Sequence, residues 1–435
     1  MKSLYGKWAL LTGSARGIGQ HVALGLAHRM RRNEQRASTK QEQDAYLRRQ
    51  VLVALGGLLC SSVNACGGSS AGAPVPVSTG MPTAKLPPPV ASAEPASAGA
   101  IVSAMAAGFN LGNTFDLGIH STQPSDIYPL LDLYQAAGMR HIRIPVTWME
   151  PTNDSVLADA TGLVNAAHPR LVQLKAVVDY ALSKGLYVVL NTHHEHWLYK
   201  RYDGSQAMDS IFSKLWQGIA AQFADYPERL IFEVLNEPQG VFGDWNGGSS
   251  PNPSNARALE LTRRINQVGY DAIRASAGLN AKRLIMVGTN GMGNHTQLRL
   301  VYPAKTDLPG GGIDPHLAIQ VHTYDPWGFC GQDGSNAAWP GERAISDPIL
   351  AVLAHARTLG VPVNYGEYGV GRQTNTAERD TDVVRGYYRL VTRTVLQKGM
   401  STTVWDDRGW FGLTGATNAG GFALVNRIVQ TMLSG

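Results

Sequence analysis

The most constraining feature of this sequence is an alternation of short apolar runs with amphipathic stretches, which begins near residue 101. The apolar runs have the length of buried strands, and the stretches between them have helical periodicity. The runs are 107–112, 140–146, 186–191, 230–236, 284–289, 317–323, 361–366 and 401–406. Eight strand–helix repeats predict an α/β fold, a (β/α)8 TIM barrel, for residues 101–435. The alternative, a doubly wound open sheet, needs a Gly-rich phosphate loop that this region lacks.

Helices are predicted between these strands. One begins with Ser125 as its cap and closes at Gly138, and another begins near Pro169 and ends around Lys184. The remaining predicted helices are 206–224, 255–276, 345–358, 377–398 and 420–433.

Residues 1–47 form an N-terminal extension that contains a short Gly-rich motif. Trp8–Gly19 has the pattern of a strand, a Gly-rich turn and a helix start, and it resembles the cofactor loop of short-chain dehydrogenases. The resemblance ends within thirty residues, and no second strand follows to bring an acidic residue to a ribose. Tyr180 and Lys184 have the Tyr-x-x-x-Lys spacing, but the pattern around them indicates an amphipathic helix. We therefore expect no cofactor, and we interpret the extension as a fusion remnant or the product of a wrong start.

Residues 48–66 have the pattern of an export signal. The basic pair Arg48-Arg49 precedes the apolar run 51–59, and Val63-Asn64-Ala65-Cys66 resembles a bacterial lipobox, in which the cysteine is lipidated. Cleavage after Ala65 without lipidation is the alternative. Residues 67–100 are rich in Ala, Pro, Ser and Gly, which predicts an extended linker. The sequence thus predicts an exported protein, either a surface or periplasmic lipoprotein attached to a membrane through Cys66 or a secreted one.

Charge and cysteine content restrict the classes of partner. The net charge is +5, but many of the basic residues lie between Arg29 and Arg49, and no stretch interleaves basic and aromatic residues. We therefore expect no nucleic-acid partner, and we expect a monomer. The part of the chain from residue 101 contains only Cys330, so it cannot have a disulfide framework.

Two glutamates occupy corresponding positions at the ends of predicted strands. Glu237 follows the run Leu230–Leu235, and Glu367 follows Val361–Tyr365. Because catalytic groups of a TIM barrel gather at the C-terminal ends of its strands, these carboxylates are expected to meet. Two carboxylates at one site are what glycoside hydrolysis requires. Other polar or aromatic residues in or after the strands are Arg143, His193, His194, Asn236, His322, Tyr324 and Trp405.

Seven motifs, in order and at barrel spacing, make residues 101–435 resemble the glycoside hydrolases of family five, a clan of retaining barrels. The motifs are Gly108–Asn113, Ile142–Val146, Asn191–His194, Asn236–Pro238, His322–Tyr324, Gly366–Gly369 and Val404-Trp405. The resemblance implies that Glu237 is the acid/base and Glu367 the nucleophile. It further implies that Arg143 keeps Glu367 ionised and that Tyr324 hydrogen-bonds it. His322 and His193 would line the cleavage point, Asn236 would bind the sugar 2-hydroxyl, and Trp405 would provide an apolar floor. Asn113 and His194 complete the expected substrate-binding set.

Further tryptophans are predicted to lie in loops on the same rim, where flat aromatic rings could stack on sugar rings. Trp148, Trp197 and Trp327 are expected to bind substrate, and Trp245 and Trp410 are further candidates. The cluster His193-His194-Glu195-His196 lacks the helical His-Glu-x-x-His spacing of zinc hydrolases, so no metal is expected.

The resemblance, together with the two glutamates, implies a retaining endo-β-1,4-glucanase that acts on β-glucan chains. Related barrels that cut mannan, xyloglucan or mixed-linkage glucan are the alternative within the same chemistry. A glycan-binding lipoprotein without activity is the alternative from a different class, and the presence of both glutamates disfavours it.

Overall fold

The computed structural model describes residues 96–153, 155–245, 250–331, 338–372, 376–418, 421–425 and 427–434. The chain divides into two units, Met1–Pro88 and Pro89–Gly435, and the described residues all belong to the second. The predictions for the extension 1–47, for the export signal 48–66 with Cys66, and for most of the linker therefore lie outside the described residues.

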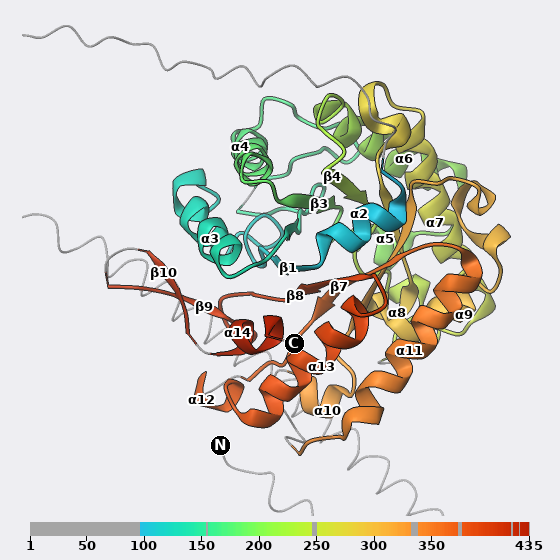
Figure 1. Cartoon of the computed structure of the whole chain (residues 1–435). Coiled ribbons are helices and arrows are strands. Elements are labelled where there is room, and N and C mark those ends of the chain that lie inside the picture. Colours follow the sequence, from blue (N-terminus) through green and yellow to red (C-terminus); the bar gives the residue numbers. More distant parts are fainter. Residues whose placement is uncertain are drawn as a thin grey trace, which may run out of the picture. The chain divides into compact units, whose positions relative to one another are not determined.

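Eight parallel strands form a closed barrel in which each strand pairs with its neighbours in sequence and β1 pairs with β8. The strands are β1 (Ala107–Asn110), β2 (His141–Ile144), β3 (Tyr187–Asn191), β4 (Leu230–Glu233), β5 (Ile285–Gly288), β6 (Leu317–Thr323), β7 (Val363–Tyr368) and β8 (Ser401–Val404). Each lies within or overlaps one of the predicted runs, so the TIM-barrel prediction is confirmed. The helices surround the strands (Figure 1).

The principal helices between the strands are α3 (Pro124–Ala136), α4 (Pro169–Ser183), α6 (Gln206–Gln222), α7 (Ala256–Arg274), α11 (Glu342–Leu359) and α13 (Asp382–Leu396). Shorter helices are α5 (His196–Arg201), α8 (Asn290–Gly293), α9 (Leu298–Val301), α10 (Trp327–Cys330), α12 (Thr376–Arg379) and α14 (Ile428–Leu433). Their apolar faces and the outward side chains of the strands form one large buried core.

Two local predictions were wrong. Ser125 does not cap α3, because the helix begins one residue earlier at Pro124, and its N-cap Gln123 makes no side-chain capping bond. Proline suits the first helical position, where the missing N–H would have no helical partner. The predicted helix 420–433 is only α14, and the residues before it belong to an antiparallel pair of strands, β9 (Thr414–Ala416) and β10 (Phe422–Leu424).

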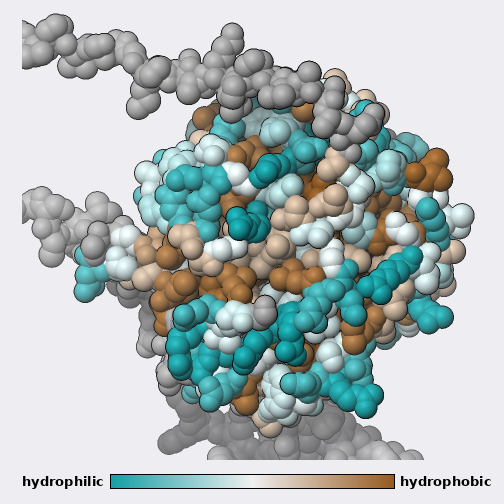
Figure 2. Space-filling view, in the orientation of Figure 1, coloured by the Kyte–Doolittle hydropathy of each residue, from teal (hydrophilic) through white to brown (hydrophobic). Residues whose placement is uncertain are grey.

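A helix that we had not predicted, α2 (Ala98–Met105), precedes the first strand. It begins within the stretch interpreted as linker, with Ser97 as its N-cap. Its apolar side chains pack against a second buried cluster formed by Val189, Ile231, Leu284, Met286 and Ala318. Several of these residues come early in their strands, so α2 closes the N-terminal end of the barrel. Figure 1 shows α2 lying across the strands, and Figure 2 shows apolar and hydrophilic side chains intermingled on this face.

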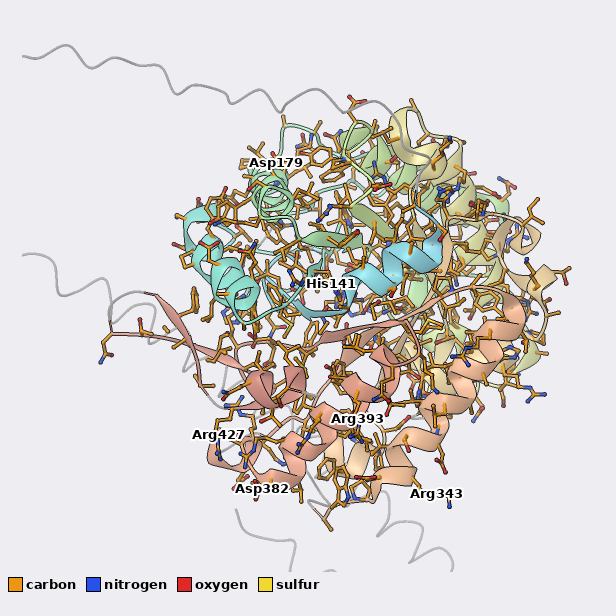
Figure 3. All side chains as sticks on the ribbon, in the orientation of Figure 1. His141, Asp179, Arg343, Asp382, Arg393 and Arg427 are labelled. Atoms are coloured by element: carbon orange, nitrogen blue, oxygen red, sulfur yellow. The ribbon has the colours of Figure 1, made fainter. Side chains whose placement is uncertain are left out.

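Buried polar side chains lie inside the barrel both at the starts of the strands and farther along them. His141 lies near the centre of the barrel beside α2, whereas labelled charges such as Asp179 and Arg343 lie on outer helices (Figure 3). The His141 Nδ1 contacts the Met105 carbonyl oxygen at 2.8 Å. Buried polar residues farther along the strands include Asn110, Arg143, Asn191, Glu233, Gln320, His322 and Glu367. Within the described part of the chain, no helix is long and apolar enough to cross a membrane.

Candidate active site

Both predicted carboxylates lie at the C-terminal end of the barrel. Glu237 follows β4, and Glu367 is the second-last residue of β7. An oxygen of Glu237, an oxygen of Glu367 and a ring nitrogen of His322 all lie within 4.8 Å of one another. The two residues are 130 positions apart in sequence, and the closure of the barrel brings them to one site.

His322 lies between the two carboxylates. Its Nδ1 is 2.8 Å from Glu237 Oε1, and its Nε2 is 3.8 Å from Glu367 Oε1. Burial lowers the pKa of His322 to about 4, so the imidazole is neutral at ordinary pH. The amide of Gln320 contacts His322 Nε2 from within the barrel. If this amide donates to Nε2, His322 carries its proton on Nδ1 and donates to Glu237.

Glu367 is buried and held from two sides. Arg143 Nη1 donates to Oε1 at 2.7 Å, and the Tyr324 hydroxyl donates to Oε2 at 3.0 Å. Burial raises the pKa of Glu367, while His322 and Arg143 oppose that rise. Because Arg143 is fully buried and permanently charged, it favours the ionised form of this carboxylate.

Glu237 also has a raised pKa, but it differs from Glu367 in that none of the Arg143 N–H groups donates to it. Burial raises its pKa to about 7, Arg143 opposes the rise and Glu233 adds to it. Its side chain keeps 22% of its surface exposed, which leaves the carboxyl group accessible from outside. Arg143 thus bonds the Glu367 carboxylate directly, while Glu237 retains a proton up to near neutral pH. This is the division of roles that a general acid and a nucleophile need.

Arg143 is not a substrate contact, which corrects its predicted place among the substrate-binding residues. It has no exposed surface, and its five N–H donors are all used. Nε and Nη2 donate to Glu233 at 2.6 and 2.7 Å. Nη1 donates to Asn110 and Glu367, and Nη2 also donates to the Asn236 side-chain oxygen at 2.6 Å. Arg143 therefore acts on substrate only through the groups that it holds.

A family model described as cellulase (glycosyl hydrolase family 5) matches residues 104–408, a span that includes all eight barrel strands. The chain belongs to glycosyl hydrolase family 5. The family expected from the motifs is thereby confirmed.

One curated relative and two solved structures illustrate the similarity. Endoglucanase A of Clostridium longisporum is 31% identical over 362 residues, which cover 78% of this chain and 64% of the relative. This chain thus spans less than two thirds of that relative's length. A GH5-4 broad specificity endoglucanase from Clostridium acetobutylicum has a TM-score of 0.65 and 26% identity, and the match covers 78% of this chain and 100% of that one. XEG5A, a xyloglucan-specific endo-beta-1,4-glucanase from a metagenomic library in complex with cellotriose, has a TM-score of 0.58 and 29% identity, covering 72% and 92%.

His193, one of the predicted histidines of this family 5 chain, lies beside Trp405. The His193 ring is parallel to the Trp405 ring, with centroids 6.2 Å apart, and it contacts the His194 ring edge-on. The Asn191 amide nitrogen lies 3.1 Å from His193 Nδ1. The same amide accepts from the Val146 N–H and donates to Glu233, so its orientation is fixed. Since Nδ1 must then accept, the proton of neutral His193 is on Nε2, where it can serve as a donor.

The predicted substrate-binding tryptophans differ in how far their rings are exposed. Trp327 is 57% exposed and lies edge-on to Tyr324, so it remains a candidate platform at the site. Trp148 is fully buried, and its indole N–H donates to the Asn191 carbonyl oxygen. Trp197 is only 7% exposed, and its indole N–H donates to Glu195. The prediction that Trp148 stacks on sugar was wrong, and Trp197 offers little surface for it, because both rings pack into the protein beneath the rim.

Asn113 contributes mainly through its backbone. It has a positive φ of 57°, its N–H donates to Asp116, and its carbonyl oxygen accepts from the His120 N–H. Asn is one of the few residues that adopts this left-handed conformation readily. The residue thus shapes the turn after β1, and no described contact joins its side chain to the carboxylates.

Sequence reasoning missed the buried polar residues beneath the site. Glu233 binds Arg143, and Asn110 accepts from Arg143 while donating to the Gly366 carbonyl oxygen. Glu195 accepts from the Trp148 and Met149 N–H groups and holds the loop after β2. A carboxylate within the apolar run Leu230–Leu235 was the one available signal for Glu233. A charge at a strand position buried on both faces requires a partner.

Two groups of described side chains could each bring three metal-ligand atoms within 4.8 Å. In the first, Asp116 with His193 and His194, the bond from Asn191 leaves His193 Nε2 protonated, so this nitrogen cannot coordinate without rearrangement. The second consists of Glu237, His322 and Glu367, which already pair with one another and with Arg143 and Tyr324. Neither group is arranged as a ready metal site.

Proposed function

We propose that this chain is a retaining endo-β-1,4-glucanase, with Glu237 as acid/base and Glu367 as nucleophile. The observation that carries the proposal is the approach of a Glu237 oxygen and a Glu367 oxygen to within 4.8 Å. Carboxyl groups about 5–5.5 Å apart suit double displacement, whereas inversion needs about 6.5–9.5 Å to admit a water molecule. The direct bond from Arg143 to Glu367 and the raised pKa of Glu237 support the assignment of roles.

In the first step, Glu367 attacks the anomeric carbon and forms a carbon–oxygen bond. The bond to the leaving sugar breaks, and the proton of Glu237 passes to the departing oxygen. Arg143 and Tyr324 hold the attacking carboxylate in place through both of its oxygens. As the negative charge of Glu367 is consumed, Glu237 becomes the ionised member of the pair.

In the second step, Glu237 takes a proton from water, and the resulting hydroxyl attacks the same carbon. The bond to Glu367 breaks, the sugar leaves with its original configuration, and both carboxyl groups return to their starting states. His322 contacts Glu237 in a neutral form, so it can remain bonded through both protonation states of that carboxyl group.

Substrate contacts are assigned to the groups that the network leaves free. The Asn236 side-chain oxygen accepts from Arg143, which turns its amide N–H groups away from the guanidinium and available to a sugar hydroxyl. His193 offers its Nε2 proton, Trp405 offers a ring face as the floor of the subsite, and Trp327 extends the aromatic surface. A contact to the 2-hydroxyl that strengthens in the transition state accelerates the reaction.

The substrate class is proposed from the relatives. The relatives described above are an endoglucanase, a broad specificity endoglucanase and a xyloglucan-specific enzyme bound to cellotriose. A β-1,4-linked glucan chain is therefore the proposed substrate, and xyloglucan is the second candidate. A reducing-sugar assay on carboxymethylcellulose, mixed-linkage glucan, xyloglucan and mannan separates these, and activity on mannan alone would contradict the proposal.

The nucleophile is tested by Glu367→Gln. The amide keeps the size of the side chain but cannot attack, so turnover on carboxymethylcellulose should fall by at least about 1,000-fold while the melting temperature changes little. Glu260→Gln is a matched control, because Glu260 is an exposed residue of α7 paired with Arg257. Residual activity of the Glu367→Gln variant near that of the control would remove Glu367 as nucleophile.

We further propose that the protein is exported and that Cys66 is lipidated. The support is the order of the basic pair, the apolar run, the lipobox-like residues and the Pro- and Ala-rich segment. Incorporation of labelled palmitate during expression in a bacterial host should be seen for the natural chain and lost in Cys66→Ala. Equal labelling of the two would refute lipidation at this position, and absence of label from both would favour cleavage alone.

A further inference from the structure

Glu233 is a buried carboxylate beneath the proposed active site, and no role has been assigned to it above. It ends β4, has no exposed surface, and lies in a strand whose other residues are Leu230, Ile231 and Phe232. An isolated charge in such a place costs several kcal/mol, so its partners decide whether it can stay ionised.

The first partner is Arg143, which Glu233 holds along one edge. Glu233 Oε2 accepts from Nε at 2.6 Å and Oε1 accepts from Nη2 at 2.7 Å. This two-point contact fixes the plane of the guanidinium. The remaining N–H groups then point to three acceptors, namely Asn110, Asn236 and Glu367. The direction of the bond to the nucleophile therefore depends on the contact on the opposite edge.

The second partner is Asn191, at the end of the neighbouring strand. Its amide nitrogen donates to Glu233 Oε1 at 3.1 Å and to His193 Nδ1 at 3.1 Å. Because the bond to Glu233 helps to fix which end of the amide faces His193, it also determines which nitrogen of His193 carries the proton. One carboxylate thus reaches both the nucleophile and a substrate-facing histidine through one intermediate residue each.

Glu233 also places a negative charge close to Glu237. One cation, Arg143, is shared by two carboxylates, Glu233 and Glu367, which leaves one net negative charge, so ionisation of a third carboxylate nearby is disfavoured. The titratable groups that face Glu237 are Arg143 on β2, Tyr199 on α5, Glu233 on β4, His322 on β6, Tyr324 just after β6, and Glu367 on β7.

We propose that Glu233 is a positioning residue for the reaction: its carboxylate, bound to Arg143 and Asn191, aims the guanidinium at Glu367 and the amide at His193. This inference rests on the proposed function. Glu233 is then the central residue of a hydrogen-bond network that connects β2, β3, β4 and β7 beneath the substrate.

The test is Glu233→Gln, which keeps the shape but turns one acceptor into a donor facing Arg143. We expect kcat on a soluble β-glucan to fall about 100-fold, the scale of a misplaced reacting group. We also expect the alkaline limb of the pH profile to move to lower pH, because the charge that disfavours ionisation of Glu237 is gone. Asp209→Asn is the matched control, since Asp209 is a buried carboxylate that pairs with Arg264 and Tyr202 on the outer helices. The control should leave the pH profile unchanged.

Two further measurements keep the outcome decisive. If Glu233→Gln does not fold, Glu233→Asp retains the charge but withdraws it by one methylene, and it should lose activity while keeping the alkaline limb in place. Titration of Glu237 by carboxyl 13C NMR, assigned with Glu237→Gln, needs no turnover and should show the lower pKa in Glu233→Gln. An unchanged rate and profile in the Glu233 variants would overturn the positioning role. Lack of activity in the natural chain would instead count against the proposed function, and the NMR titration would still show whether Glu233 acts on Glu237.

Discussion

Arg143 determines how charge is shared among the buried carboxylates at this site. It forms ion pairs with Glu233 and Glu367, while Glu237 lies just beyond and pairs with neutral His322. Three carboxylates around one cation cannot all be ionised cheaply, and the most exposed of them, Glu237, is the one that can exchange its proton with substrate and water. The proposed acid role rests on this arrangement rather than on any property of Glu237 alone.

At the residue scale, the raised pKa of Glu237 predicts the alkaline limb of activity. Glu237 must be protonated to act as acid, and burial raises its pKa to about 7, so kcat/KM on an unactivated β-glucan should fall as the pH rises through about 7. The acidic limb should follow protonation of Glu367. Rates measured across this range on a soluble glucan check the prediction.

The control for this limb is Glu237→Ala. It should slow substrates with poor leaving groups far more than activated aryl glycosides, and it should remove the alkaline limb for the latter, since activated leaving groups need no proton. A natural-chain profile that stays flat well above pH 7, or equal slowing of both substrate types, would contradict the acid role of Glu237.

The site residues at or just after the strand ends, and Arg143 through its motif, could be predicted from the sequence, whereas the network beneath them could not. Glu237, Glu367, His322 and Tyr324 stand out because polar residues at strand ends of a barrel have few structural uses. Glu233 and Asn191 contact one another across neighbouring strands, and their value depends on a register that no local pattern reveals. The prediction that Trp148 binds sugar was wrong because a ring in a loop can pack inward as readily as outward.

At the element scale, α2 is the clearest example of a helix whose role is purely structural. Its residues Ile101, Val102 and Met105 pack against the first positions of the strands, and the reacting groups lie at the other end of the barrel. The Ala-rich sequence around it resembles the linker that precedes it, which explains why composition alone extended the linker to residue 100. Only the burial of one face distinguishes the two.

Ile101→Ala should therefore destabilise the fold without changing the chemistry. Loss of a buried Ile side chain costs about 2–5 kcal/mol, so the midpoint of urea unfolding should fall while kcat at a permissive temperature stays near that of the natural chain. Ser103→Ala, on the exposed side of the same helix, is the control and should change neither quantity appreciably. A large loss of kcat in folded Ile101→Ala would show that α2 is coupled to the site.

At the scale of the whole molecule, the periodic strand–helix pattern was sufficient to predict the closed barrel, because each strand and each helix can be recognised from its own stretch of sequence. The pattern could not predict the antiparallel pair β9–β10, which replaces part of the expected last helix. The position of this pair is explained by Asp406, which follows β8. Its carboxylate accepts from the Thr414 hydroxyl and the Leu413 N–H and so anchors this segment to the end of β8. Such side-chain anchors act over short distances in space that the sequence periodicity does not record.

The central claim is that Glu237 and Glu367 act on opposite sides of one glycosidic bond without room for a water molecule between the attacking carboxylate and the sugar. Proton NMR of the first product formed from a soluble cello-oligosaccharide measures this directly. The account predicts that the new reducing end appears first as the β-anomer and converts to the α-anomer only by slow mutarotation. Initial appearance of the α-anomer would mean inversion and would contradict the double-displacement mechanism.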